Sequence, residues 1–261
     1  MVVLSFIHRL CGGNAGPIAL AAEGAPNPDQ ALCLVGDIHG RLDLLQQLMA
    51  CHERAFADYR LVFLGDAIDR GPASAGVLHR LQELAAGGAI VLRGNHEAML
   101  LAFLDDPADE ASTRWLIHGG REFLASFGVT IGQDEEADSA SARITARDSL
   151  RAAMGPELET WLRALPCLWQ SGDLVAAHAG MDLHLPLDQQ TEATLLWGNP
   201  TRMPGLRADG LWVAHGHVIS ERAYVRDRRI ALDTGAYASG VLSYALVEPQ
   251  GPEIRLGYVK G

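Results

Sequence analysis

Three short segments place metal-binding side chains directly after apolar runs of the chain. Residues 36–40 read GDIHG, residues 65–71 read GDAIDRG, and residues 94–97 read GNHE. The apolar run before each segment is typical of a buried strand, so neighbouring strand ends would bring these groups to one edge of a sheet. Carboxylate, amide and imidazole groups are ligands for divalent transition metals. The pattern therefore predicts a site for two metal ions.

The three segments supply only part of the ligands that two ions need, because each ion takes several and one carboxylate has to bridge the pair. Two later histidines, His178 and His217, also follow apolar runs, at residues 174–177 and 212–214. Both are therefore expected at strand ends as well. The candidate metal ligands are Asp37, His39, Asp66, Asn95, His178 and His217.

The elements that must position these residues follow from the apolar pattern. Apolar runs predict strands near residues 32–35, 61–64 and 89–92, with a helix after each of the first two and another helix over residues 97–104. This β-α-β-α-β order predicts parallel strands with ligands outside their carboxyl ends. From residue 167 onward, short apolar runs predict a second, mostly antiparallel sheet.

Two regions depart from this strand and helix pattern. Residues 105–166 carry two helical patterns separated by an acidic stretch rich in Ser and Ala, which predicts a small helical cap inserted between catalytic strands. Residues 1–30 are rich in Gly, Ala, Pro and Asn, which predicts a mobile N-terminal arm. We therefore expect a single domain over residues 31–261.

Composition limits the partners. The formal net charge is −11 and the pI about 5.3, so the average field would repel a nucleic acid or an anionic membrane, and neither is expected as a partner. The four cysteines are scattered without a CxxC pair, which favours a reducing compartment. Residues 1–30 contain no apolar run long enough for a signal peptide or a transmembrane helix. A cytoplasmic location is the expectation.

The order of the motifs resembles the metallophosphoesterase (calcineurin-like) superfamily, and within it the bacterial and phage serine/threonine phosphoprotein phosphatases. The similarity rests on the three opening segments, followed by AHAG at residues 177–180 and HGH at residues 215–217, and it extends from about residue 32 to about residue 244. The stretches LDTGAY and WLIHGG are weaker signals. The resemblance implies an α/β fold, a four-layer α-β-β-α sandwich of two mixed sheets with a small helical cap insertion.

The resemblance also implies which metal each ligand binds. Asp37 and His39 would bind the first ion, Asp66 would bridge both, and Asn95, His178 and His217 would bind the second. His215 and His217 compete for one of these positions, since they lie two residues apart in the same segment. We expect His217 to be the ligand and His215 to have a structural role or to support the ligands. Manganese is favoured for both ions, with iron or zinc as alternatives.

Four further residues are assigned to proton and phosphate handling. By the resemblance, His96 would be the general acid that protonates the departing alkoxide, and Asp69 would orient its imidazole. Arg70 and Arg93 would donate hydrogen bonds to the phosphoryl oxygens.

These roles predict a dinuclear metal-dependent phosphatase that hydrolyses phosphomonoesters by direct attack of a metal-bridging hydroxide. The resemblance favours a serine/threonine protein phosphatase with broad specificity, whose partner is a phosphorylated protein or a small phosphate ester. Its oligomeric state is left open. Ala67 replaces an aromatic residue of many relatives, and Asn199 replaces a phosphate-binding arginine that Arg202 could substitute. We therefore expect a less basic and more open pocket.

Two other functions stay open. A dinucleoside polyphosphate hydrolase, of the type that acts on diadenosine tetraphosphate, shares the early motifs but commonly lacks the acid that Asp69 supplies. A non-catalytic phosphate-binding scaffold is disfavoured by the complete set of candidate ligands together with His96.

Overall fold

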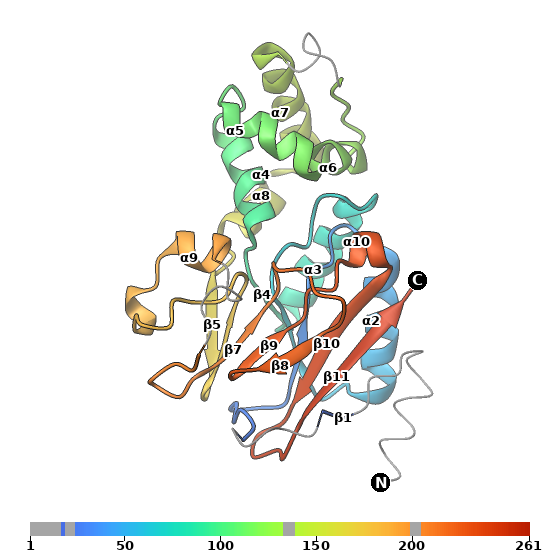
Figure 1. Cartoon of the computed structure of the whole chain (residues 1–261). Helices are drawn as coiled ribbons and strands as arrows, with labels where there is room; N and C mark the ends of the chain where they lie inside the picture. The colour runs from blue at the N-terminus through green and yellow to red at the C-terminus, as the bar shows by residue number, and fades with distance from the viewer. Residues whose placement is uncertain (1–16, 19–23, 133–138, 199–204) are drawn as a thin grey trace.

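A computed structural model describes residues 17–18, 24–132, 139–198 and 205–261. Two sheets face each other (Figure 1). Within the described residues, the first sheet has six strands in the order β1-β11-β10-β2-β3-β4. They are β1 (Pro17–Ile18), β2 (Leu32–Val35), β3 (Arg60–Phe63), β4 (Ile90–Val91), β10 (Val241–Val247) and β11 (Ile254–Lys260). Strands β2, β3 and β4 pair in parallel, as their order in the sequence predicts.

The second sheet has the described order β5-β6-β7-β9-β8. Its strands are β5 (Leu168–Ser171), β6 (Leu174–Ala177), β7 (Trp212–His215), β8 (Tyr224–Arg226) and β9 (Arg229–Ala231). The expectation of a mostly antiparallel sheet is wrong, because β6, β7 and β9 pair in parallel and only the two outer strands are antiparallel. The long connection from β6 to β7, which contains α9 (Glu192–Trp197), allows the parallel pairing.

Strands β10 and β11 were also expected in the second sheet, and this too is wrong. They form a hairpin whose first strand pairs antiparallel with β2, so they extend the first sheet. A two-strand apolar pattern does not specify which of two sheet edges it joins. Both sheets are consequently mixed, as the family resemblance implies.

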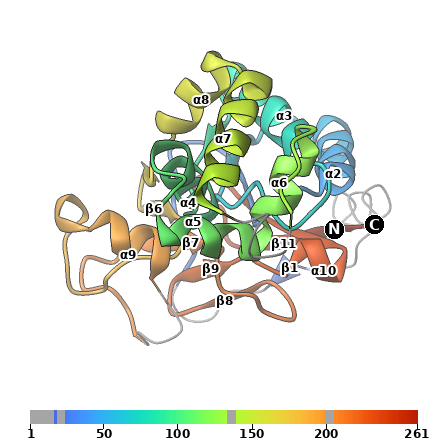
Figure 2. The ribbon, with the colours of Figure 1, turned by 90° about the horizontal axis from the view of Figure 1, so that it is seen from above.

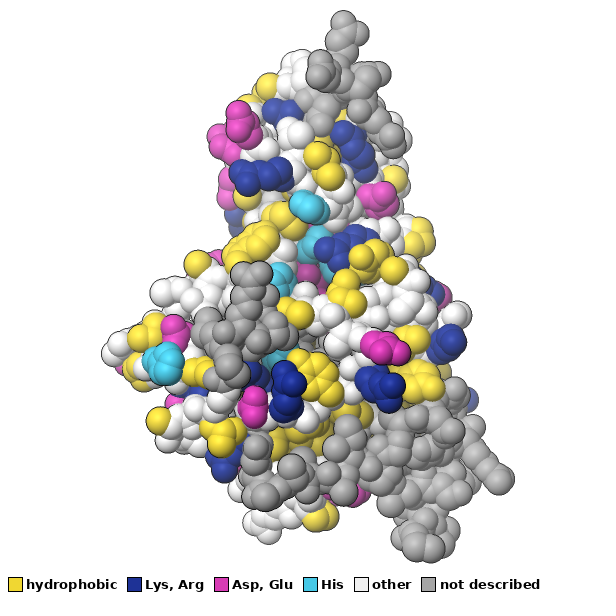
Figure 3. All heavy atoms as spheres, in the orientation of Figure 1, with side chains coloured by type: hydrophobic (Ala, Val, Ile, Leu, Met, Phe, Trp, Pro, Cys, Tyr) yellow, Lys and Arg dark blue, Asp and Glu magenta, His cyan; other side chains and the backbone are white. Residues whose placement is uncertain are grey.

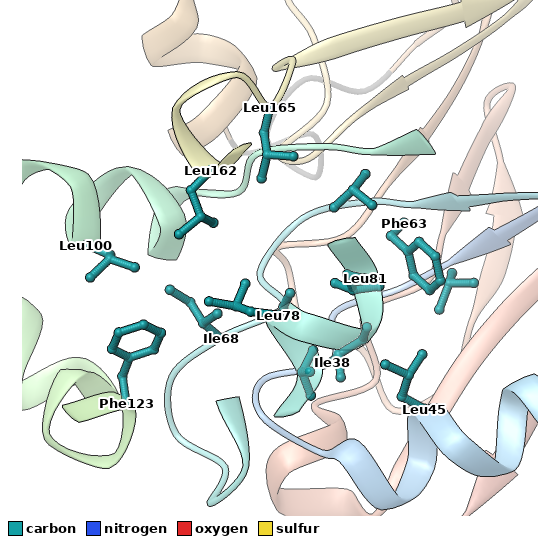
Figure 4. Packing of buried hydrophobic residues seen from close by; sticks show 14 of the residues in the cluster. Ile38, Leu45, Phe63, Ile68, Leu78, Leu81, Leu100, Phe123, Leu162 and Leu165 are labelled. Atoms are coloured by element: carbon teal, nitrogen blue, oxygen red, sulfur yellow. The ribbon is translucent and has the colours of Figure 1, made fainter. Parts of the chain in front are cut away.

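The apolar side chains of β6 show how the layers stack. Leu174 and Ala176 pack between the two sheets, whereas Val175 and Ala177 face the other side, where they join Leu195 of α9. On the far face of the first sheet, α2 (Leu42–Ala55) and α3 (Ser74–Ala86) cover the larger core, of which Figure 4 shows a part. The predicted four-layer α-β-β-α sandwich is confirmed.

The helical insertion stands over the sheet edge that carries the candidate site (Figures 1 and 2). It follows α4 (Asn95–Asp105) and consists of α5 (Glu110–Trp115), a π-helical turn (Leu116–Gly120), α6 (Arg121–Ser126), α7 (Ala140–Met154) and α8 (Pro156–Arg163). The two predicted helices are each interrupted, the first near Gly119 at φ 117° and the second at Gly155 and Pro156. A short turn (Leu187–Gln189) and α10 (Ala236–Ser239) complete the described helices.

Most of the predicted N-terminal arm lies outside the described residues, and so do Asn199 and Arg202. The described end of that segment lies against the body: the backbone N–H of Asn27 donates to Asp173 at 2.5 Å, and that of Asp29 donates to Ser171 at 2.9 Å. Pro17–Ile18 pairs with β11. The division into an arm and one domain stays a prediction.

The helices and the cysteines bear on the expected location. No helix among the described residues is long and apolar enough to cross a bilayer. Cys33 and Cys167 are free thiols, whereas Cys51 is disulfide-bonded. Because disulfide bonds persist mainly in oxidising compartments, the bonded Cys51 does not support the expected reducing compartment, which stays a prediction.

Candidate metal centre

The carboxyl ends of strands from both sheets bring the six predicted ligands to one region. Asp37 follows β2, Asp66 follows β3, and Asn95 begins α4 just beyond β4. His178 and His217 follow β6 and β7 of the facing sheet. The helix after β4 begins at Asn95 rather than at residue 97, so Asn95 is held by the first turn of α4. Figure 3 shows histidine and acidic side chains in a hollow below the insertion.

Three of the predicted ligands of the second ion converge on one another. Asn95 Oδ1 lies 2.9 Å from His178 Nε2 and 3.0 Å from His217 Nδ1. His178 Nδ1 donates to the Leu64 carbonyl at 2.9 Å, so Nε2 is the ring nitrogen that faces Asn95. Burial alone would lower the pKa of His178, but the Asp66 carboxylate raises it above its usual value, so positive charge at Nε2, from a proton or a metal ion, is favoured. The donor set therefore fits a divalent ion.

Asp66 joins this group to a second one. Its Oδ1 lies 3.3 Å from His178 Nε2, while its Oδ2 lies 3.6 Å from His39 Nε2. His39 Nδ1 donates to the Ile68 carbonyl at 2.7 Å, so a neutral His39 also turns a lone pair toward the centre. The two oxygens of Asp66 thus face different histidines, which is the arrangement that a bridging carboxylate needs.

Asp37 contributes an excess of negative charge. Burial and the nearby carboxylates of Asp233 and Asp66 raise the pKa of Asp37 well above its usual value. Its carboxylate accepts the backbone N–H of His217 at 3.1 Å. One hydrogen bond does not offset the free-energy cost of burying several carboxylates. Bound cations usually compensate the negative charge of such a cluster.

His96 and Asp69 form a hydrogen-bonded pair beside the ligands. His96 Nδ1 donates to Asp69 Oδ2 at 2.6 Å, and its Nε2 lies 3.9 Å from Asp66 Oδ2. Burial alone would lower the pKa of His96, but the carboxylates of Asp66 and Asp69 raise it above its usual value. The pair therefore holds an imidazole with a fixed tautomer and with Nε2 toward the centre.

The two predicted phosphate-binding arginines differ in their contacts. Arg70 Nη2 donates to His96 Nε2 at 3.1 Å, and the guanidinium carbon lies 4.7 Å from the centre of the Tyr237 ring. Arg93 Nη2 instead donates to the Arg163 carbonyl at 2.6 Å, and its Nη1 contacts Glu192 at 3.3 Å. The structure thus brings Arg70 to the site and holds the Arg93 guanidinium against α8 and α9. The phosphate role of Arg93 stays a prediction.

His215 contacts the backbone beside the site. Its side chain is buried, and its Nδ1 lies 3.1 Å from the Gly216 carbonyl. Burial lowers the pKa of His215 to about 4, so its ring is neutral at physiological pH. These contacts agree with a structural role for His215.

The site is built on strained backbone. His39, Asp66, Asp69, Arg70 and His217 all adopt positive φ, between 45° and 70°. Each such residue costs roughly 1–2 kcal/mol relative to an ordinary conformation. Strain of this kind persists only where surrounding contacts enforce it, and it gathers at functional sites.

One residue that enforces the strain was missed by the sequence reasoning. The buried Glu97 carboxylate accepts the backbone N–H groups of Gly94 at 2.7 Å, Asp66 at 3.0 Å and Ala67 at 2.8 Å. Burial and the charge of Asp66 raise the pKa of Glu97 to about 7. A glutamate three residues after a helix N-cap is a recognisable capping signal, but its reach to Asp66 is not visible in the sequence.

Two other residues were missed although their segments were noted. Asp233 is buried near Asp37 and accepts the backbone N–H of Gly235 at 2.8 Å. Trp115, in the insertion, donates its indole N–H to Asp69 Oδ2 at 2.8 Å. The stretches LDTGAY and WLIHGG signalled these residues, but gave them no role.

Comparisons with known proteins agree with this geometry. The model of the calcineurin-like phosphoesterase family matches residues 32–221. The serine/threonine-protein phosphatase 1 of Salmonella typhimurium is 44% identical over 91 residues, which are 34% of this chain and 39% of that protein. The symmetrical bis(5'-nucleosyl)-tetraphosphatase of Ralstonia nicotianae is 29% identical over 268 residues, 84% of this chain and 91% of that protein. The chain thus spans well under half of the phosphatase.

Solved structures show the same fold. The crystal structure of a putative diadenosine tetraphosphatase superposes with a TM-score of 0.60 at 22% identity, over 90% of this chain and 96% of that chain. At this identity the likeness concerns the fold.

Proposed function

The chain belongs to the calcineurin-like phosphoesterase family, and from that premise we propose that it is a metal-dependent phosphatase acting on phosphomonoesters of alcohols, including phosphoserine and phosphothreonine. The observation that carries the proposal is the hydrogen-bonded pair of His96 and Asp69 beside the converging ligands. An alkoxide is a strongly basic leaving group, so its departure needs a proton donor. A phosphate leaving group is far less basic than an alkoxide, so its departure depends much less on a proton donor.

The family's site holds two divalent ions on histidine and aspartate ligands. In this chain we assign Asp37, His39 and Asp66 to one ion, and Asp66, Asn95, His178 and His217 to the other. The ligand atom of His96 also lies within 4.8 Å of those of His39 and Asp66, and we assign His96 to proton transfer because its ring is hydrogen-bonded to Asp69. When bound, such ions lower the pKa of a water nucleophile and stabilise negative charge on phosphoryl oxygens. Manganese is our preferred metal, with iron or zinc as alternatives.

Arg70 and His96 would divide the remaining work. The Arg70 guanidinium, stacked on Tyr237, is placed to donate hydrogen bonds to phosphoryl oxygens. A phosphoryl group that takes up Arg70 would leave His96 Nε2 free to hold its proton toward the leaving oxygen. Asp69 would keep the His96 ring in that orientation through Nδ1.

A second candidate is a symmetrical dinucleoside tetraphosphatase. It is favoured by the match to the Ralstonia enzyme over 91% of that protein's length, whereas the match to the serine/threonine phosphatase covers 39% of that protein. The two candidates share the metal site and differ in the leaving group.

A substrate panel separates them. We would compare kcat/KM for a phosphothreonine peptide, p-nitrophenyl phosphate and diadenosine tetraphosphate on the manganese-loaded protein, with Asp66→Asn as the inactive control. The proposal expects the two monoesters to be preferred. A preference for diadenosine tetraphosphate by about tenfold or more, equal to about 1.4 kcal/mol in transition-state binding, would instead establish the second candidate. Absence of turnover on all three would favour a phosphate-binding scaffold.

A further inference from the structure

The helical insertion reaches the catalytic pair through one indole. We propose that Trp115 is a positioning residue for the general acid: by donating its N–H to Asp69, it fixes the carboxylate that orients His96. The inference rests on the proposed role of His96. It gives the insertion a direct part in the chemistry, in addition to covering the site.

The contact geometry supports this role. Asp69 Oδ2 accepts two hydrogen bonds, from His96 Nδ1 at 2.6 Å and from Trp115 Nε1 at 2.8 Å. A carboxylate oxygen offers two lone pairs in its plane, so both are occupied. Among the described residues, Asp69 Oδ1 is buried without a hydrogen-bond partner. The two donors on Oδ2 therefore set the plane of the carboxylate.

The indole is itself held rigidly. Trp115 is fully buried, with its ring centre 4.7 Å from that of Phe103 and 5.9 Å from that of Phe123. Gly120 lies so close that a Cβ there would approach the ring to 2.6 Å. A donor that cannot shift imposes its direction on the acceptor. Loss of the N–H would free the Asp69 carboxylate to rotate.

The insertion also fits closely against the backbone of the pair. A Cβ at Gly119 would lie 2.4 Å from the backbone nitrogen of Arg70 and 2.9 Å from Asp69 Cβ. Asp69 and Arg70 both hold positive φ at this contact. The π-helical turn that contains Gly119 therefore packs on the strained segment, next to the indole contact.

The hydrogen bond from Trp115 to Asp69 could also be purely structural, because any buried indole N–H needs an acceptor. The dependence of the rate on the leaving group distinguishes a positioning role from a structural one. A defect in proton donation slows esters of basic alcohols and spares esters whose leaving group departs without a proton. A general loss of structure slows both alike.

The experiment uses Trp115→Phe on the manganese-loaded full chain, with a phosphothreonine peptide and p-nitrophenyl phosphate as substrates. We expect kcat on the peptide to fall about tenfold or more, which is the usual effect of removing a hydrogen-bond partner that orients an active-site side chain. Turnover of p-nitrophenyl phosphate should change by less than about twofold on the same reasoning. KM should stay the same for both. Trp161→Phe, a half-buried tryptophan of α8, is the matched control and should alter neither.

Equal losses on both substrates, or no loss on either, would overturn the inference. His96→Asn tests the proposed function separately, since it should itself slow the peptide reaction. Adding Trp115→Phe to His96→Asn should then cause no further loss, and a full additional loss would overturn the inference while leaving the role of His96 intact. If Trp115→Phe does not fold, benzothienylalanine placed at residue 115 keeps the ring shape and removes only the N–H donor, and the same outcomes apply.

Discussion

At the scale of single residues, three histidines of the site share one hydrogen-bonding pattern. His39, His178 and His96 each use Nδ1 to donate to an oxygen, a carbonyl for the first two and the Asp69 carboxylate for the third. This leaves Nε2 of each ring turned toward the centre, where it can bind a metal ion or hold a proton. The acceptors differ in charge: the Asp69 carboxylate stabilises a charged imidazolium more strongly than a carbonyl does, which suits His96 to the role of an acid.

The first prediction concerns His96. In His96→Asn, turnover of a phosphothreonine peptide should fall by about 10²–10⁴-fold, the usual contribution of a general acid. Bound metal, measured by elemental analysis, should not change, because His96 is not a proposed ligand. His184→Asn, at an exposed histidine, is the control. Loss of metal in His96→Asn would show that His96 acts as a ligand instead.

The second prediction concerns His215. Its pKa is about 4 in the folded chain and about 6.5 when exposed, so the unfolded chain binds more protons between these values. The contribution of His215 to the free energy of unfolding should therefore be fully present above pH 6.5. It should decrease as the pH falls toward 4, by up to about 3 kcal/mol. Urea unfolding at several pH values checks this. In His215→Asn the decline should be shallower, and parallel curves would contradict the assignment.

At the scale of elements, the insertion and the sheet edge are fitted to each other at Gly119. An alanine there would press on the Arg70 backbone in addition to adopting a φ of 117°. We expect Gly119→Ala to lower the free energy of unfolding by about 2–4 kcal/mol and to reduce kcat.

The matched control is Gly128→Ala, at φ 75° with open space around its Cβ. It should cost only about 1–2 kcal/mol, from backbone strain, and leave kcat unchanged. Thermal and urea unfolding together with steady-state rates measure both variants. Equal effects in the two would mean that the contact between the π-helical turn and Arg70 has no part in the site.

The sequence predicted the elements whose signals are local. The run at residues 32–35 marked β2 at its observed bounds, and the ligands after it follow from strand order. The contact of Trp115 with Asp69 joins residues 46 apart in the chain, and no local pattern encodes it. The same holds for Arg93, whose motif suggested phosphate while its guanidinium contacts Glu192 and the Arg163 carbonyl. Long-range packing decided these features.

At the scale of the whole molecule, the centre lies where two sheets and the insertion meet. Ligands from both sheets must stay in register for His178 and His217 to converge on Asn95. A cation that binds only this folded arrangement stabilises it by linkage. The formal charge of −11 would repel a phosphate ester, so bound cations and Arg70 also give the site its local positive character.

Metal titration of the stripped protein tests the central claim most directly. The chain would be freed of metal with a chelator and titrated with Mn²⁺ while p-nitrophenyl phosphate turnover is followed. We predict negligible turnover without metal and a plateau at two ions per chain, with a parallel rise in the melting temperature. Full turnover in the stripped protein, or a plateau at one ion per chain, would contradict a dinuclear hydrolase.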